Sequence, residues 1–91
     1  MRYFLSKIEK MLLKILSGNS DSNISFDDLL GLLQHLGLTY RVKGSHYIFG
    51  KVGTDLMINL QRDGKMAKTY QIQQVRKKLI EYQLFNGYLD V

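Results

Sequence analysis

Two predicted strands meet near the middle of the chain in the segment Lys43-Gly44-Ser45-His46-Tyr47-Ile48-Phe49. Ahead of it, apolar and polar residues alternate with the two-residue period of a half-buried strand. The apolar positions of this first strand are Leu38, Tyr40 and Val42, and the polar ones are Thr39, Arg41 and Lys43. Gly44-Ser45 has the length and composition of a hairpin turn, and His46 begins the second strand. The segment therefore predicts a hairpin with a basic outer face.

A third strand is predicted over residues 54–60, where apolar residues again occupy every second position. These positions are Leu56, Ile58 and Leu60, and the turn before them is Gly50-Lys51-Val52-Gly53. Short connections between all three strands predict an antiparallel meander. His46 shares one face of its strand with Ile48, which we expect to face the core, so His46 is expected at the rim of the sheet.

The N-terminal residues predict an amphipathic helix, because apolar residues recur at spacings of three and four. These residues are Phe4, Leu5, Ile8, Met11, Leu12, Ile15 and Leu16. Gly18 is the expected end of the helix, and the polar residues 19–23 form a linker. Three interpretations stay open. The helix packs on the rest of the chain, which we favour, or it pairs with a partner or a second copy, or it lies on a membrane surface.

A second helix is predicted from Ser25, whose hydroxyl can accept a hydrogen bond from the backbone N–H of Asp28. The helix ends before Gly37, a residue type that commonly follows the last turn. The side chains expected to point inward are those of Phe26, Leu29, Leu30, Leu33 and Leu36. His35 lies near the end of this helix, and we interpret it as a structural or surface residue.

The last helix is predicted to begin at a Thr69 cap. Its buried stripe comprises Ile72, Val75 and Leu79, and its solvent-facing side comprises Arg76, Lys77 and Lys78. Beyond it lies an apolar tail that either docks or frays, comprising Phe85, Tyr88 and Leu89. Helices on one face of a three-stranded antiparallel sheet would bury the apolar sides of all these elements, so the predicted fold class is α+β.

The 91 residues suffice for one domain with a modest core. Residues 41–78 contain nine basic and two acidic residues, a net charge of +7, whereas the rest of the chain carries a net charge of −2. Such a basic region is typical of a surface that binds a polyanion, and also of an ordinary solvated face. The chain has no cysteine and no apolar run of membrane-spanning length, so we expect a cytoplasmic protein without a membrane partner.

The composition leaves few catalytic chemistries open. Without cysteine there is no thiol nucleophile, and two histidines without nearby carboxylates form no recognisable metal site, so we expect neither a metal nor a cofactor. Asp55 and Asp63 are too few for a two-metal nuclease. RNA supplies its own nucleophile, the 2′-hydroxyl group, so its cleavage needs only a base, an acid and cations for the phosphate.

His46 is the candidate acid or base, since histidine can serve as either at neutral pH. Phosphate contacts are expected from Lys43, at a strand end, and from Lys65 and Lys68, in the loop before the last helix. Backbone N–H groups at the start of that helix, near Thr69, are expected to point at the same phosphate. The alternative for His46 is a strand residue that only hydrogen-bonds a neighbour.

This arrangement resembles the HicA family, the small toxins of bacterial and archaeal toxin–antitoxin pairs. The resemblance covers residues 24–84 and lies in a helix over 27–36, then Gly37-Leu38, the Lys43–Phe49 segment, a short strand, a turn and a final helix. It implies a fold like that of double-stranded-RNA-binding domains. It divides the chain into an N-terminal helix and linker (1–23) and a HicA-like ribonuclease domain (24–91). It further implies endoribonuclease activity on messenger RNA (an mRNA interferase) and neutralisation by a cognate HicB-type antitoxin.

The resemblance aligns the catalytic histidine of the family with His46, and Gly44 and Ser45 shape its turn. The candidate RNA- and phosphate-binding residues are Lys43, Gly44, Ser45, Lys65 and Lys68. Many members carry a second histidine near the end of the third strand. This chain lacks it, so its role would pass to Lys65, Lys68, Arg62 or water. An oligomer could form through the antitoxin or through the N-terminal helix.

Two other functions stay open. The spacing Lys65-Met66-Ala67-Lys68 is similar to the lysine cluster of double-stranded-RNA-binding domains, which predicts an RNA-binding module without catalysis. Alternatively, the basic half binds an acidic protein, which predicts no RNA affinity at physiological salt. Replacing His46 by alanine distinguishes the ribonuclease from the RNA-binding module, because only the ribonuclease would lose its activity.

Overall fold

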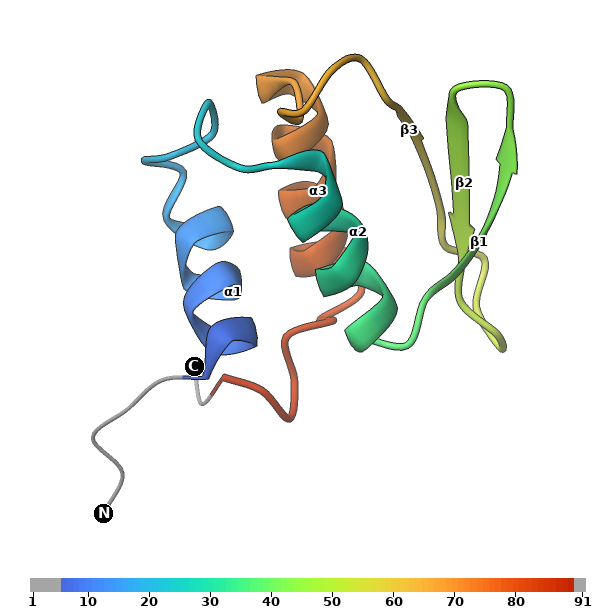
Figure 1. Cartoon of the computed structure of the whole chain (residues 1–91). Coiled ribbons are helices and arrows are strands. Elements are labelled where there is room, and N and C mark those ends of the chain that lie inside the picture. Colours follow the sequence, from blue (N-terminus) through green and yellow to red (C-terminus); the bar gives the residue numbers. More distant parts are fainter. Residues whose placement is uncertain (1–5, 90–91) are drawn as a thin grey trace.

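The computed structural model describes residues 6–89 and has the predicted α+β architecture (Figure 1). Its elements are α1 (Lys7–Ser17), α2 (Phe26–His35), β1 (Thr39–Lys43), β2 (His46–Gly50), β3 (Met57–Gln61) and α3 (Thr69–Glu81). The strands form one antiparallel sheet in the order β1-β2-β3, which confirms the predicted meander. Phe4 and Leu5, which the sequence places in the first helix, lie outside the described residues.

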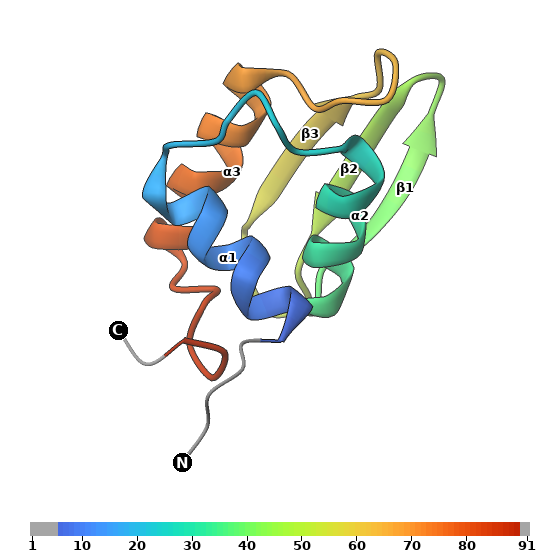
Figure 2. The ribbon, with the colours of Figure 1, turned by 60° about the vertical axis from the view of Figure 1, so that its left-hand side comes forward.

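The elements form three layers (Figure 1). α2 and α3 cover one face of the sheet, and α1 lies across these two helices on the side away from the sheet (Figure 2). Within residues 6–89, no helix covers the other face of the sheet, which is open to solvent. In the same range, no helix is long and apolar enough to cross a bilayer.

Both ends of α1 are well capped. The Ser6 hydroxyl accepts from the backbone N–H of Glu9 at 3.1 Å, and the Glu9 carboxylate accepts from the N–H of Ser6 at 2.9 Å, a capping box that was not predicted. Gly18 follows the helix with a φ of 74°, as predicted for its C-terminal end. Leu12 and Ile15 are fully buried, which confirms that this helix packs on the rest of the chain.

The hydrophobic core lies between the sheet and its two covering helices, and extends to α1. The Ser25 hydroxyl accepts from the N–H of Asp28 at 3.0 Å, so α2 begins as predicted. The largest fully buried side chains come from all three helices, β2, β3 and the residue before Ser25: Leu12, Ile15, Ile24, Phe26, Leu29, Leu32, Leu33, Phe49, Ile58, Leu60, Ile72 and Leu79. Each such side chain stabilises the fold by about 1.5–3 kcal/mol relative to its exposed state.

The predicted start of β3 is wrong by three residues, because β3 begins at Met57 rather than at Thr54. The Thr54 hydroxyl donates to the Lys51 carbonyl at 2.8 Å and accepts from the N–H of Leu56 at 3.2 Å. Thr54 therefore stabilises a turn that continues past Gly53, whose φ is 82°.

The predicted cap of α3 is also wrong, because Lys68 precedes the first helical residue, Thr69. The Gln71 side chain takes over the capping role and accepts from the N–H of Lys68 at 3.0 Å. Gln71 is buried, and its Nε2 donates to the Gln61 carbonyl at 2.7 Å. This amide thus fixes the start of α3 against the end of β3.

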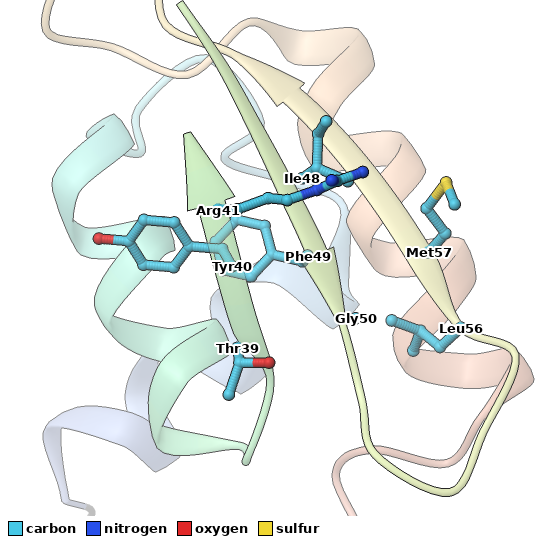
Figure 3. A pocket seen from close by; sticks show the side chains of 8 residues that line it. All are labelled: Thr39, Tyr40, Arg41, Ile48, Phe49, Gly50, Leu56 and Met57. Atoms are coloured by element: carbon cyan, nitrogen blue, oxygen red, sulfur yellow. The ribbon is translucent and has the colours of Figure 1, made fainter. Parts of the chain in front are cut away.

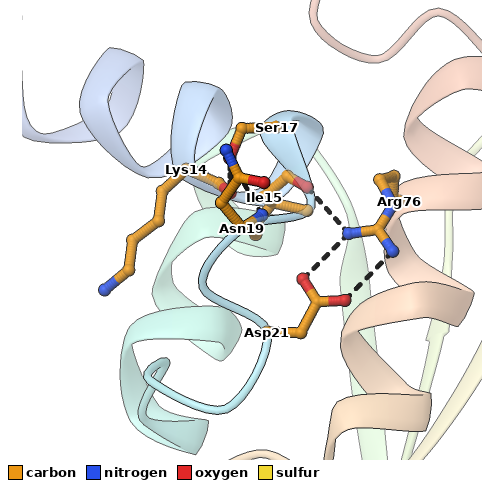
Figure 4. A network of polar contacts seen from close by, with 6 residues as sticks. All are labelled: Lys14, Ile15, Ser17, Asn19, Asp21 and Arg76. Atoms are coloured by element: carbon orange, nitrogen blue, oxygen red, sulfur yellow. Dashed lines mark hydrogen bonds and ion pairs between the residues drawn. The ribbon is translucent and has the colours of Figure 1, made fainter.

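Arg76 is not solvent-facing, contrary to the prediction (Figure 4). Its Nη1 donates to the Ile15 carbonyl at 3.0 Å and to Asp21 Oδ1 at 2.9 Å, and its Nη2 donates to Asp21 Oδ2 at 3.0 Å. These bonds join α3 to the end of α1 and to the linker that follows it. Of the two adjacent lysines, Lys77 is exposed as predicted, whereas Lys78 is half-buried.

The apolar tail docks on the core. Leu84 is buried, and Phe85, Tyr88 and Leu89 pack partly buried against the core. The Tyr88 hydroxyl donates to the His35 carbonyl at 3.1 Å, and the two rings meet edge to face with their centroids 5.7 Å apart. These contacts support the structural interpretation of His35.

Candidate nucleic-acid interface

The predicted site lies on the hairpin that joins β1 to β2. Lys43 and His46 are cross-strand partners, and Gly44-Ser45 is the two-residue turn between them. Gly44 has a φ of 61°, which glycine adopts without steric cost. The structure therefore brings Lys43, Gly44, Ser45 and His46 together at one end of the sheet, and all four are exposed.

His46 is the first residue of β2, beside the turn, and its side chain points to the open face of the sheet. Ile48 shares this face, so the expectation that Ile48 faces the core is wrong. Tyr47 and Phe49 face the helices instead: Phe49 is 1% exposed, and the Tyr47 ring meets the Phe26 ring with centroids 5.3 Å apart. Both sides of β2 carry apolar residues, so alternation alone could not identify the buried side.

Asn59 of β3 orients the His46 ring. The Nδ1 atom of His46 lies 3.1 Å from Oδ1 of Asn59, and both residues are exposed. Because an amide oxygen only accepts hydrogen bonds, Nδ1 is the donor in this contact, and in the neutral ring the lone pair then lies on Nε2. His46 thus presents a proton-accepting nitrogen on the open face.

The turn beside His46 is attached to the end of β3. Gln61 is the cross-strand neighbour of His46, and its Nε2 donates to Ser45 Oγ at 3.2 Å. The backbone N–H of Arg62 donates to the Ser45 carbonyl at 2.9 Å. These bonds restrain the hairpin on which His46 sits.

Arg62 itself is held by three side chains of the protein, at a half-buried position. Its Nη2 donates to Asp27 Oδ1 at 2.6 Å, its Nε donates to the Tyr47 hydroxyl at 3.3 Å, and its guanidinium lies 4.6 Å from the Phe26 ring centroid. The hydrogen bond to Asp27, followed by that to Tyr47, raises the pKa of Arg62. A guanidinium held in this way does not exchange a proton, so Arg62 is unsuited to replace a second histidine.

Lys65 and Lys68 lie on the loop between β3 and α3, and both are exposed. The Lys68 ammonium is 3.1 Å from the Asp63 carboxylate. Lys68 and Gln61 line one hollow of about 180 Å³, which brings this loop close to the residue beside His46. Among the hydrogen bonds and ion pairs of residues 6–89, none joins either lysine to His46.

Three residues of this surface, Arg41, Asn59 and Gln61, were not predicted as site residues. They share the open face with His46, because Arg41 pairs with Ile48 and Ile48 pairs with Asn59. The only sequence signal for these three residues was the alternation of apolar and polar positions along their strands. This alternation gives the face on which each residue lies, but not the register between strands, and the register decides how close each residue lies to His46.

No protein-family model, curated protein or solved structure matches the chain significantly. The geometry of the hairpin and the charges around it are therefore the basis for assigning a function.

Proposed function

We propose that this chain is a metal-independent endoribonuclease that cleaves messenger RNA, with His46 as its general acid or base. The observation that supports this best is the hydrogen bond from His46 Nδ1 to Asn59, which leaves Nε2 available on an exposed basic surface. A base that is oriented by a neighbouring hydrogen-bond acceptor is an arrangement common in general base catalysis.

In the proposed reaction, Nε2 of His46 takes the proton from a 2′-hydroxyl group. The 2′-oxygen then attacks the adjacent phosphorus, and the P–O5′ bond breaks to leave a 2′,3′-cyclic phosphate. Lys65, Lys68 or water supplies the proton for the departing 5′-oxygen. Lys43, which pairs with His46 across the strands, would neutralise the phosphate, with Gly44 and Ser45 forming the turn beside it.

The biological context of the proposal is a type II toxin–antitoxin pair of the HicA kind. The element order from α2 onward, one helix, three antiparallel strands and one helix, agrees with a fold like that of double-stranded-RNA-binding domains. The proposed partners are messenger RNA and a HicB-type antitoxin, and the proposed site of action is the cytoplasm, where messenger RNA is translated.

The test is induced expression of the wild-type chain, His46→Ala and His35→Ala, with growth and messenger-RNA integrity as readouts. His35→Ala is a matched control, because His35 is the other histidine and contacts the C-terminal tail. We expect wild type and His35→Ala to arrest growth and to leave 2′,3′-cyclic phosphate ends, and His46→Ala to do neither. Equal effects of wild type and His46→Ala would refute the catalytic role.

A non-catalytic RNA-binding module is the second candidate. It is favoured by the neighbours of His46, since neither Lys43 nor Gln61 across the strands is a second histidine or carboxylate. This function predicts RNA binding that is equal in wild type and His46→Ala and no cleavage by either.

A further inference from the structure

The open face of the sheet contains a shallow hollow of about 320 Å³, separate from the hairpin turn (Figure 3). Its lining includes Thr39 and Arg41 from β1, Ile48 and Gly50 from β2, and Met57 from β3. Met57 is 63% exposed, and Gly50 has no side chain to fill the space. The hollow thus has an exposed apolar floor, and it extends to the end of the sheet opposite the Gly44-Ser45 turn.

The strand side chains on this face include cations but no carboxylate. The residues of the three strands that face this side are Thr39, Arg41, Lys43, His46, Ile48, Gly50, Met57, Asn59 and Gln61. None of them is acidic, and Figure 3 shows the Arg41 side chain extended across the sheet past Ile48. Interfaces between proteins are depleted in lysine, and their buried cores are depleted in charged residues. The chemistry of this face therefore fits an anionic ligand that also carries flat apolar groups, which describes a nucleic acid.

We infer that the hollow binds one unstacked nucleobase, and that the substrate is therefore single-stranded RNA. This inference rests on the proposed function and specifies its substrate class. Ile48 and Met57 contact the face of the base, the Arg41 guanidinium stacks on the base or binds its phosphate, and the Thr39 hydroxyl hydrogen-bonds its edge.

A duplex cannot use this hollow in the same way. Paired bases are stacked and present only their edges, so a duplex laid on this face would bring phosphates and sugars against Ile48 and Met57. A single strand can turn a base toward the protein and bury its face. A hollow with an apolar floor and cations beside it therefore favours binding of a single strand over binding of a duplex.

The hollow is correctly placed relative to His46. Gly50 lies four residues beyond His46 on β2, which corresponds to about 13 Å at ~3.3 Å per residue. Lys43 and Arg41 occupy the same face of β1 along this path. The bound base thus belongs to a nucleotide near the scissile bond, and the RNA backbone follows Lys43 and Arg41 between the two positions.

Binding measurements in the His46→Ala variant of the 91-residue chain test this inference without cleavage of the RNA ligand. The ligands are a short fluorescent RNA without self-complementarity and the same RNA annealed to its complement, and anisotropy is measured at fixed salt. We expect Met57→Ser to weaken binding of the single strand by about fivefold or more, the scale of losing a stacking contact, and to leave duplex binding unchanged. Ile80→Ser is the matched control, since Ile80 is a similarly exposed apolar residue on α3.

Gly50→Ala provides a second variant that fills the hollow instead of removing its floor. An added Cβ would meet only the Leu56 carbonyl, at 3.8 Å, so the fold tolerates it. We expect this variant also to weaken single-strand binding, whereas Gly31→Ala, at an exposed glycine with open space around it, has no effect. Thermal melts of all variants check that the fold is retained.

The possible results separate this inference from the proposed function. If Met57→Ser and Gly50→Ala bind the single strand like their parent, or lose single strand and duplex equally, the base site is refuted. An unchanged affinity would leave the hollow for another occupant, such as a protein. If these variants lose single-strand binding but His46→Ala cleaves RNA like wild type, the binding site stands and the catalytic role of His46 falls.

Discussion

The Asp21 carboxylate accepts two parallel hydrogen bonds from the Arg76 guanidinium, at 2.9 and 3.0 Å, and both side chains are largely withdrawn from solvent. Bidentate pairs of this kind are among the stronger polar contacts in proteins. Arg76 also donates to the Ile15 carbonyl in the last turn of α1, where a cation is favourable for the helix dipole. A single side chain on α3 thus fixes both the end of α1 and the linker to α2.

Arg76→Met should destabilise the protein by about 2 kcal/mol, because it leaves the Asp21 carboxylate without its partner. This corresponds to a fall of about 10 °C in Tm for a domain of this size. Thermal unfolding followed by circular dichroism measures the difference. Lys77→Met removes a charge from the adjacent exposed position and should change the free energy of unfolding by less than about 0.5 kcal/mol. Equal effects of both substitutions would show that the Arg76 contacts contribute nothing specific.

The same pair predicts a loss of stability in acid. The hydrogen bond from Arg76, and to a lesser extent its charge, lower the pKa of Asp21, and burial opposes them. Because the folded-state pKa lies below the unfolded value near 3.8, the stabilisation is fully present above that value and is lost as pH falls through the folded pKa. Urea unfolding should therefore show a difference between wild type and Asp21→Asn that is constant above about pH 5 and shrinks below about pH 4. A difference that persists unchanged to the acid limit would contradict the assignment.

Apolar periodicity was sufficient to predict most of the fold. The spacing of Leu12 and Ile15, and of Ile72, Val75 and Leu79, identified the buried sides of α1 and α3 correctly. Local polar patterns were less informative. The side chains of Thr69 and Gln71 are both suited to cap the start of α3, and only the contact of Gln71 with Gln61 shows that Gln71 makes the cap.

The Arg76–Asp21 pair could not be predicted, since its members are 55 positions apart in the chain. On an isolated helix Arg76 resembles its neighbours Lys77 and Lys78. Only the position of the α1–α2 linker shows that Arg76, and not these lysines, binds Asp21. Contacts of this kind depend on how elements pack, which the period of a single element does not specify.

Tyr82 predicts a loss of stability in alkali. Its hydroxyl donates to Asp55 at 2.7 Å, and this bond, followed by burial and the charges of Asp55 and Glu81, raises the pKa of Tyr82 to about 12. The folded-state pKa lies above the ordinary tyrosine value of 10.0, so the stabilisation is fully present below about pH 10 and is lost as pH rises toward 12. Thermal melts should show that wild type loses stability in this window faster than Tyr82→Phe. Tyr70→Phe, at a 60% exposed tyrosine, should follow wild type, and a Tyr82→Phe curve parallel to wild type would refute the prediction.

On the proposed function, the ion pair between Lys68 and Asp63 would limit the positive charge that this loop offers to RNA. Both side chains are exposed, so the pair is weak and sensitive to salt. Asp63→Asn should strengthen RNA binding severalfold at low salt and steepen the dependence of affinity on salt, because Lys68 becomes available for a phosphate. Lys68→Gln should have the opposite effect. If Asp63→Asn leaves both affinity and salt slope unchanged, Lys68 makes no phosphate contact.

The candidate site could be predicted only in part. His46 and Lys43 were identified from residue type and from their position at a two-residue turn, where the register is fixed by the turn itself. Asn59 could not be identified in this way, because its position opposite Ile48 depends on the longer connection between β2 and β3. Thr54 lengthens that connection by bonding to the backbone, and this shift of the strand start was not visible in the alternation.

Asn59 acts, on the proposed mechanism, as a positioning residue for His46. Asn59→Ala removes the acceptor for Nδ1, so the ring loses its fixed tautomer and the cleavage rate should fall about fivefold while RNA affinity changes little. Asn59→Asp keeps an acceptor but adds a negative charge, which favours the imidazolium form. It should therefore retain cleavage and move the His46-dependent limb of the pH–rate profile to higher pH.

These two outcomes distinguish positioning from a structural role. A merely structural Asn59 would make both variants less stable without moving the pH profile, so each variant needs a thermal melt beside its rate measurements. If Asn59→Ala cleaves RNA at the wild-type rate with an unchanged profile, the hydrogen bond to His46 has no part in catalysis. The support for His46 would then be reduced to its exposure beside Lys43 on the open face.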